Sequence, residues 1–208
     1  MRLSAWDLTI ERGGRRLIAG LSFTADQGSS LIVTGPNGAG KSTLLRALCG
    51  FLPVEAGGFA LEGGDPERSV GEQAHYLGHA DGVKGALTAG ENLAFAAAML
   101  DGRSSRQAQL DALVRVGLAH VIDFPARLLS AGQRRRVAIA RLLIAERTLW
   151  LLDEPTTALD AAAQAALTAI MQAHLRGGGV IVAAAHAPLG LERAQEVWLG
   201  PTRNGARA

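Results

Sequence analysis

A glycine-rich loop that ends in a lysine and two hydroxyl residues lies near residue 40. The stretch GPNGAGKST, residues 35–43, places three glycines before Lys41 and Ser42. Glycines let the backbone turn its N–H groups toward phosphate oxygens, a lysine ammonium can reach β- and γ-phosphates, and a serine hydroxyl can join a Mg²⁺ shell. The pattern therefore predicts a nucleoside triphosphate site. Its predicted residues are Gly35, Pro36, Asn37, Gly38, Ala39, Gly40, Lys41, Ser42 and Thr43.

Two carboxylates follow an apolar run further along the chain. Residues 149–154 read LWLLDE, so Asp153 and Glu154 follow a stretch that predicts a buried strand. Beside a phosphate loop, Asp153 is expected to hold Mg²⁺ together with Ser42. Glu154 is expected to orient or deprotonate the water that attacks the γ-phosphate. Adjacent residues can take these different roles because their side chains point in different directions.

A third stretch, LSAGQRRRVAIARL at residues 129–142, predicts an anion site of another kind. Ser130 and Gln133 have the spacing of a capping box, which predicts that a helix begins here. The free N–H groups and the dipole at a helix start attract anions. The three arginines, residues 134–136, point about 100° apart in a helix, so they cannot all face one phosphate. We expect at most one near a nucleotide and the others in contact with acids or solvent.

The composition argues against a nucleic-acid-binding protein. Of 208 residues, 21 are basic and 19 acidic, which gives a formal net charge of +2, and no aromatic residues alternate with the arginines. The single cysteine, Cys49, predicts a buried residue and no internal disulfide. No apolar run approaches the ~20 residues of a membrane span, and the N-terminus does not read as a signal peptide. The chain is therefore expected to be soluble and to act at a membrane only through a partner.

The pattern between these motifs predicts the elements that must position them. Strands are expected at 3–10, 17–25, 29–34, 148–152 and 180–185, and the first two form an antiparallel pair. Helices are expected at 43–50, 91–100, 105–118, 131–145 and 161–175. The order predicts an α/β fold with a phosphate-loop nucleotidase core, residues 1–79 and 146–208. An antiparallel β subdomain joins this core, and a helical subdomain of about residues 80–145 is inserted into it.

The order of the motifs resembles that of the nucleotide-binding subunits of ABC transporters, over nearly the whole chain. GPNGAGKST resembles their Walker A motif, LWLLDE their Walker B motif with its catalytic glutamate, and LSAGQ their signature, which usually reads LSGGQ. Ala158-Leu159-Asp160 is similar to the D-loop, and His186 to the switch histidine that contacts the γ-phosphate. The resemblance implies an ATP hydrolase with ATP and Mg²⁺ as bound groups, and a catalytic role for His186 beside Glu154.

In that family, the signature of one subunit contacts ATP held by the Walker A motif of a second subunit. The resemblance therefore implies a homodimer in which signature and D-loop residues complete the partner's site. The residues so implied are Ser130, Ala131, Gly132, Gln133 and Asp160. Ala131 replaces the usual glycine, which is tolerable if the position needs no positive φ. His79 stands where the family usually has the glutamine that relays the ATP state to a membrane subunit, and Arg12 falls near the usual adenine-stacking aromatic residue.

Within the family, the compact length and the stretches LGHADG, LSAGQRRRVAIARL and LWLLDEPTTALD resemble the ATPase subunits of haem exporters in bacterial cytochrome c maturation. That resemblance implies a peripheral subunit on the cytoplasmic face of the inner membrane, joined to integral permease subunits. The alternatives are the ATPase subunit of another ABC exporter and a soluble ABC ATPase outside transport, which usually joins two nucleotide domains. A phosphate-loop kinase or GTPase is a further alternative, but it would not need LSAGQ.

Overall fold

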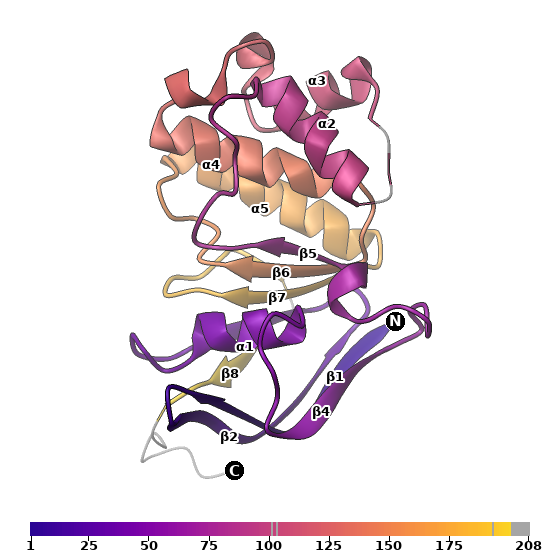
Figure 1. The fold of residues 1–208 in the computed structure, drawn as a ribbon, viewed down its shortest axis with the longest axis vertical. Coiled ribbons are helices and arrows are strands. Elements are labelled where there is room, and N and C mark those ends of the chain that lie inside the picture. Colours follow the sequence, from indigo (N-terminus) through magenta and orange to yellow (C-terminus); the bar gives the residue numbers. More distant parts are fainter. Residues whose placement is uncertain (101, 103, 193, 201–208) are drawn as a thin grey trace.

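The computed structural model describes residues 1–100, 102, 104–192 and 194–200 (Figure 1). Within these residues the chain forms an antiparallel sheet, a parallel sheet and helices on both sides of the latter. The elements in chain order are β1 (Arg2–Arg12), β2 (Arg15–Asp26), β3 (Ser30–Thr34), α1 (Lys41–Leu48), β4 (Ala56–Glu62), β5 (Ala74–Leu77), α2 (Ala89–Met99), α3 (Arg106–Arg115), α4 (Ala131–Ala140), β6 (Leu149–Asp153), α5 (Ala161–Arg176), β7 (Val180–Ala184) and β8 (Ala194–Trp198).

The parallel sheet has the strand order β5-β6-β7-β3-β8, and the antiparallel sheet has the order β2-β1-β4. All five residues of β6 are buried, as are all five of β7. Their side chains alternate between two cores because successive strand residues point to opposite faces. Leu149 and Leu151 join the core under the antiparallel sheet, whereas Trp150 and Leu152 join the core under the helices.

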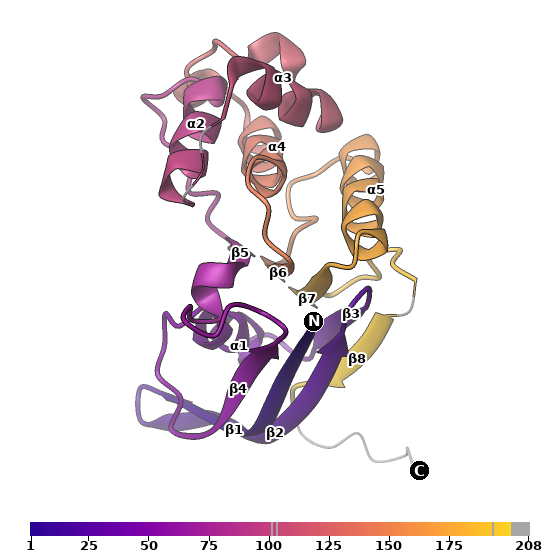
Figure 2. The same cartoon turned by 90° about the vertical axis from the view of Figure 1, so that its right-hand side faces the viewer.

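The parallel sheet is therefore the middle layer of the molecule. Helix α1 and the antiparallel sheet cover one face, and α5 with the layer of α2, α3 and α4 covers the other (Figures 1 and 2). The helical layer stands at one end of the molecule, and α4 lies between the other two helices and the sheet (Figure 1). Loops that follow the carboxyl ends of β3, β5, β6 and β7 meet at one edge of the sheet, where ligands of such folds bind.

Most predicted elements are confirmed, but three strands were missed. The structure adds β4, β5 and β8 to the five predicted strands. Two adjacent glycines obscure β4 in the sequence. Gly57 has φ +74°, and a Cβ there would lie 2.3 Å from the carbonyl oxygens of Trp6 and Asp7, so glycine permits the close approach of β1. β8 has the exposed polar start AQE and lies at an edge of the sheet, which explains its weak apolar pattern.

The predicted helical insertion contains α2, α3 and α4, and α4 is shorter than expected. It ends at Ala140 and continues as a 3₁₀ turn, Arg141–Leu143. The division into a core and a helical subdomain stays a prediction, and its last residues, 201–208, lie outside the described residues. Among the described residues, none of the helices combines the length and the apolar character that crossing a bilayer requires.

Candidate active site

The phosphate loop connects β3 to α1 and takes a backbone path that depends on its glycines. Gly35, Gly38 and Gly40 have φ values of +143°, +80° and +102°. A Cβ on Gly35 would lie 2.0 Å from the carbonyl oxygen of Leu199, so only glycine fits there. Lys41 is buried, and its ammonium donates to the carbonyl oxygens of Gly35 at 2.8 Å and Pro36 at 3.1 Å. The loop thus curls around the lysine.

Helix α1 begins directly at this loop. Gly40 is its N-cap, in a left-handed conformation and without a capping side chain. The first N–H groups of a helix have no partner inside the helix, and they carry the positive end of its dipole. Because no side chain caps them, they are available to an anion bound within the loop. The sequence prediction placed Lys41, Ser42 and Thr43 here, and the structure brings them together at the helix start.

Asp153 at the end of β6 lies next to Ser42. The Ser42 hydroxyl donates to Asp153 Oδ1 at 2.9 Å, and Asp153 is 1% exposed. Its second oxygen, Oδ2, is buried without a hydrogen-bond partner among the described residues. An unpartnered buried carboxylate oxygen is costly unless another group binds it. A hydroxyl and a carboxylate are the hard oxygen ligands that Mg²⁺ prefers, so this pair fits the metal.

Glu154 follows Asp153 but leaves the strand. Its φ is +46°, a left-handed value that is uncommon for a residue with a side chain. Its N–H donates to Ala184 O at 2.9 Å, and Thr157 Oγ1 donates to Glu154 Oε2 at 3.3 Å. The other oxygen, Oε1, lies 3.3 Å from Nε2 of His186. Backbone strain of this kind concentrates at functional sites. The structure therefore brings together the two residues predicted as catalytic.

The signature stretch begins α4 as predicted. Ser130 Oγ accepts a hydrogen bond from the Gln133 N–H at 3.1 Å, and Gln133 Oε1 accepts one from the Ser130 N–H at 2.9 Å, which confirms the capping box. Ala131 is the first helical residue, so its methyl group requires no unusual φ. Gly132 is tighter, because a Cβ there would lie 3.0 Å from the carbonyl oxygen of Ala158. The signature therefore contacts the D-loop of its own chain.

The remaining predicted residues take positions around this edge of the sheet. Asp160 is the N-cap of α5, where its Oδ1 accepts from the Ala163 N–H at 2.8 Å. His79 is exposed and follows β5 after Gly78. Arg12 ends β1 and is exposed, and the described residues that line a groove of about 530 Å³ beside the phosphate loop include Leu17 and Trp198 but not Arg12. Roles for these residues toward a nucleotide or a second subunit stay predictions.

The three arginines of the signature helix bind mostly backbone carbonyls. Arg134 donates to Leu129 O at 2.7 Å and Arg136 to Val116 O at 3.3 Å. Among the described residues, an acidic partner is found for Arg135 alone of the three, which contacts Asp81. Arg135 is 3% exposed and also donates to carbonyl oxygens outside the helix. The burial of Arg135 was not predicted from the sequence, although the spacing of the apolar residues that follow it indicates an inward-facing position.

This spacing is that of the helical period around Arg135. Three apolar residues, Ala138, Ile139 and Leu142, follow it at intervals of three, four and seven, and all three are buried. Residues at these intervals share one face of a helix. Arg135 therefore lies on the inward face of α4.

Two other buried titratable groups lie outside the cluster of predicted site residues. Burial raises the pKa of the Cys49 thiol to about 12, which confirms the predicted buried cysteine and keeps it protonated. Burial lowers the pKa of His75 to about 4, although its Nε2 contact with the Ala145 carbonyl oxygen at 2.7 Å opposes the shift. His75 is therefore neutral near pH 7, and neither group has the character of a reactive residue.

The chain is similar to proteins of known name over nearly its whole length. A sequence profile of the ABC transporter family matches residues 18–157. The chain is 55% identical to the cytochrome c biogenesis ATP-binding export protein CcmA of Nitrobacter winogradskyi over 200 residues. This alignment covers 96% of this chain and 98% of that protein. It is 54% identical over 204 residues to the protein of the same name from Nitrobacter hamburgensis, with 97% and 100% covered.

Solved structures have a similar fold. A putative ABC transporter ATP-binding protein from Pyrococcus furiosus superposes with a TM-score of 0.84 over 96% of this chain and 98% of that one, at 22% identity, which shows the fold alone. A bacterial Atm1-family ABC exporter with ATP bound superposes with a TM-score of 0.78 at 26% identity, over 89% of this chain and 34% of that one. The predicted fold class is confirmed by these likenesses.

Proposed function

The chain belongs to the ABC transporter family, and on this basis we propose that it is the ATP-binding and ATP-hydrolysing subunit of an exporter that serves cytochrome c biogenesis. The observation that carries the proposal is the cluster at one edge of the parallel sheet. Ser42 contacts Asp153 there at 2.9 Å, and Glu154 contacts His186 at 3.3 Å. These are the groups that ATP hydrolysis needs for the metal and for the attacking water.

Each residue of the cluster has a proposed part in hydrolysis. The N–H groups of the phosphate loop and the Lys41 ammonium bind the phosphates and offset their charge. Glu154, which is 35% exposed, takes a proton from the attacking water through its carboxylate. His186 orients that carboxylate and the γ-phosphate through its imidazole ring. The Glu154 carboxylate contacts Thr157 and His186, and these contacts hold its oxygens in a fixed orientation for accepting a proton.

Ser42 and Asp153 are the proposed Mg²⁺ residues. The Ser42 hydroxyl and the free Oδ2 of Asp153 would hold the ion, directly or through water. Mg²⁺, when bound, would offset charge on the β- and γ-phosphate oxygens. The buried position of Asp153 keeps its carboxylate at a fixed distance from the phosphate loop, so the binding of metal and nucleotide would be coupled.

A homodimer is the proposed active assembly. Signature residues Ser130, Ala131, Gly132 and Gln133 begin a helix of the helical layer, and the phosphate loop begins a helix of the core. In the family, these two helix starts contact one ATP from two subunits. Asp160 lies two residues after Ala158, whose carbonyl oxygen would lie 3.0 Å from a Cβ on Gly132. The proximity of signature and D-loop supports a shared dimer surface.

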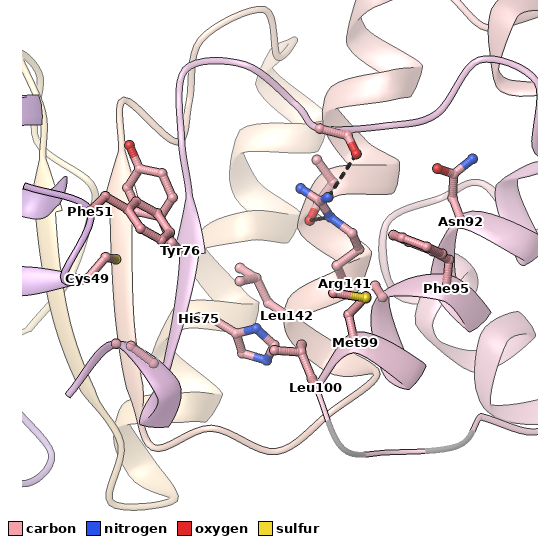
Figure 3. A pocket seen from close by; sticks show the side chains of 15 residues that line it. Cys49, Phe51, His75, Tyr76, Asn92, Phe95, Met99, Leu100, Arg141 and Leu142 are labelled. Atoms are coloured by element: carbon pink, nitrogen blue, oxygen red, sulfur yellow. Dashed lines mark hydrogen bonds between the residues drawn. The ribbon is translucent and has the colours of Figure 1, made fainter. Parts of the chain in front are cut away.

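An integral permease is the proposed membrane partner, docked on an apolar groove between the core and the helical layer (Figure 3). The groove has a volume of about 310 Å³. Phe51 lies at its core side, and Phe95 and Met99 of α2 lie at the other, with exposed fractions of 65%, 43% and 68%. Exposed apolar groups gathered in one groove mark an interaction site. The segment that carries His79 runs from β5 past this groove to α2.

The groove assignment has a direct test. Met99→Glu places a charge in the apolar groove and is expected to abolish co-purification with integral membrane proteins, while ATP binding is retained. Leu128→Glu is the control, because Leu128 is equally exposed at 68% but does not line the groove. Equal co-purification of Met99→Glu and the wild type would contradict the assignment.

The proposed location and cargo are supported by the names of the relatives. Their shared name describes an export protein of cytochrome c biogenesis. We propose that ATP hydrolysis serves the export of haem or its release from a haem chaperone, and that the chain is bound peripherally through its permease at the cytoplasmic face of the inner membrane.

Replacement of the proposed base tests the function. Glu154→Gln keeps the size of the side chain but removes its capacity to take a proton, so kcat for ATP hydrolysis is expected to fall about 10²- to 10⁴-fold. ATP is expected to remain bound, and the dimer to persist in gel filtration with ATP and Mg²⁺. Glu67→Gln, at an exposed loop position, is the control with unchanged turnover. Turnover of Glu154→Gln within two-fold of the wild type would refute the assignment.

A further inference from the structure

Arg135 connects the signature helix to the catalytic edge of the parallel sheet. It lies in α4, five residues after the serine that begins the signature cap. Its Nη1 donates to Gly78 O at 2.7 Å and contacts Asp81 Oδ1 at 3.2 Å. Its Nη2 donates to Asp153 O at 3.1 Å and to Glu154 O at 2.8 Å. The Arg135 side chain thus contacts the backbone of Asp153 and Glu154 and also the segment that carries His79.

The guanidinium is suited to this position. Its N–H donors lie in one plane and point in fixed directions, so it can span several carbonyl oxygens at once. Arg135 is 3% exposed, and a buried cation needs paired donors. Its Nη1 and Nη2 are paired, whereas its Nε has no hydrogen-bond partner among the described residues. Two of the carbonyls belong to consecutive residues, Asp153 and Glu154, at the point where the chain leaves β6. The guanidinium therefore fixes the peptide units on both sides of the strained Glu154.

The neighbouring arginines provide a contrast within the same helix. Arg134 donates to Leu129 O and Arg136 to Val116 O, and both carbonyls belong to the helical layer. Those contacts stabilise that layer internally. Arg135, by comparison, crosses from the helical layer to the core, so a movement of α4 relative to the sheet would act on the Glu154 carbonyl through it.

The segment after β5 is held to the same helix at a second point. Arg141, in the turn that continues α4, donates to the carbonyl oxygens of Asp81 and Gly82. Arg135 binds the carbonyl of Gly78 and the carboxylate of Asp81. The five residues from Gly78 to Gly82, which include His79, are therefore attached to α4 at both ends.

We propose that Arg135 is a positioning residue for ATP hydrolysis. It holds Glu154 in the left-handed conformation that directs its carboxylate to His186, and it ties that conformation to the position of α4 and of the His79 segment. This inference rests on the proposed role of Glu154 as the base. It assigns Arg135 no contact with ATP, so the phosphate loop and its affinity for nucleotide are independent of it.

The test compares Arg135→Gln with Arg136→Gln in the full chain, purified with its membrane partner. Arg135→Gln is expected to lower kcat at least ten-fold and to change the KM for ATP less than two-fold, because Glu154 is misdirected while the phosphate loop is intact. Arg136→Gln, which removes a similar contact within the helical layer, is expected to keep kcat. An Arg135→Gln protein with wild-type kcat, or a fall in kcat that Arg136→Gln reproduces to the same extent, would overturn the proposal.

Two further variants keep the outcome decisive. Arg135→Lys retains a cation opposite Asp81 and is expected to fold even where Arg135→Gln does not, with a kcat between those of the glutamine variant and the wild type. Wild-type kcat in Arg135→Lys would overturn the role of the planar guanidinium. Glu154→Gln measured beside them separates the two ideas. If Glu154→Gln retains turnover, the proposed function is wrong. If Glu154→Gln loses turnover but the Arg135 variants keep a normal kcat, only the inference about Arg135 is wrong.

Discussion

The two helices that begin at predicted phosphate-binding motifs begin in different ways. Helix α1 follows Gly40, which has φ +102° and no side chain to cap the helix. Helix α4 follows Ser130, which forms a complete capping box with Gln133. Both starts present N–H groups and the positive end of a helix dipole. They differ in how far the protein itself satisfies those groups.

The difference indicates two kinds of anion site. At α1, the loop curls around Lys41, and the helix start has no cap of its own, so a ligand bound in the loop completes it. At α4, the box satisfies the N–H groups of Ser130 and Gln133, so the helix start is stable alone. Only the N–H groups of the two residues between them are left for a ligand. The first site suits a nucleotide held by one chain, and the second suits a preformed surface that a second chain presents.

The two helix starts also differ in how closely other backbone atoms pack against their glycines. A Cβ on Gly35 would lie 2.0 Å from Leu199 O, which no adjustment of a side chain relieves. A Cβ on Gly132 would lie 3.0 Å from Ala158 O, which is a tight contact but longer than the 2.0 Å at Gly35. Ala131, the first helical residue of α4, occupies the position of the usual glycine with an ordinary helical backbone.

Of the two helix starts, the larger expected effect comes from Lys41→Met, which removes the cation of the α1 site. Hydrogen bonds to charged groups contribute about 1.5–3 kcal/mol, so ATP affinity is expected to fall roughly 10- to 100-fold. The measurement is a nucleotide titration of the isolated chain, followed by calorimetry or fluorescence. Lys84→Met, at the chain's other lysine, is the control and should bind ATP normally. Equal affinities of the two variants would mean that the α1 site does not hold the nucleotide.

The two starts also differ in how well the sequence predicts them. The phosphate loop and the capping box are local patterns, because each depends on residues within a few positions of one another. For this reason the helix start at Ser130 and Gln133 was predicted correctly, and the helix after the phosphate loop was predicted at residues 43–50, two residues later than α1 begins. The apolar runs predicted as strands at 148–152 and 180–185 were likewise sufficient to predict the buried centre of the parallel sheet, where β6 spans Leu149–Asp153 and β7 spans Val180–Ala184.

The contacts of Arg135 could not be predicted in the same way. Its partners are carbonyl oxygens, which every residue has, so the sequence does not reveal which of them will be near. Gly78 and Glu154 are 57 and 19 positions away from it and meet it only through the sheet order. The contact between Glu154 and His186 was implied by a family resemblance, because periodicity alone does not predict a left-handed φ at the end of a strand.

A smaller effect is expected from Ser130→Ala, which weakens the α4 site and leaves the α1 site intact. Loss of an N-cap costs about 1 kcal/mol, so kcat is expected to fall roughly five-fold as the helix start frays and binds the partner's nucleotide less well. ATP affinity of the isolated chain should be unchanged, since Lys41 and its loop are untouched. This split between turnover and single-chain affinity is the opposite of the result expected for Lys41→Met.

Ser105→Ala is the matched control for that variant. Ser105 caps α3 and accepts from the Ala108 N–H at 3.1 Å, the same distance as in the cap of α4. Both variants should lower the temperature of unfolding to a similar extent, but only Ser130→Ala should lower kcat. If both lowered kcat equally, the effect would come from stability of the helical layer. The capped helix start would then have no separate part in the nucleotide site of a second chain.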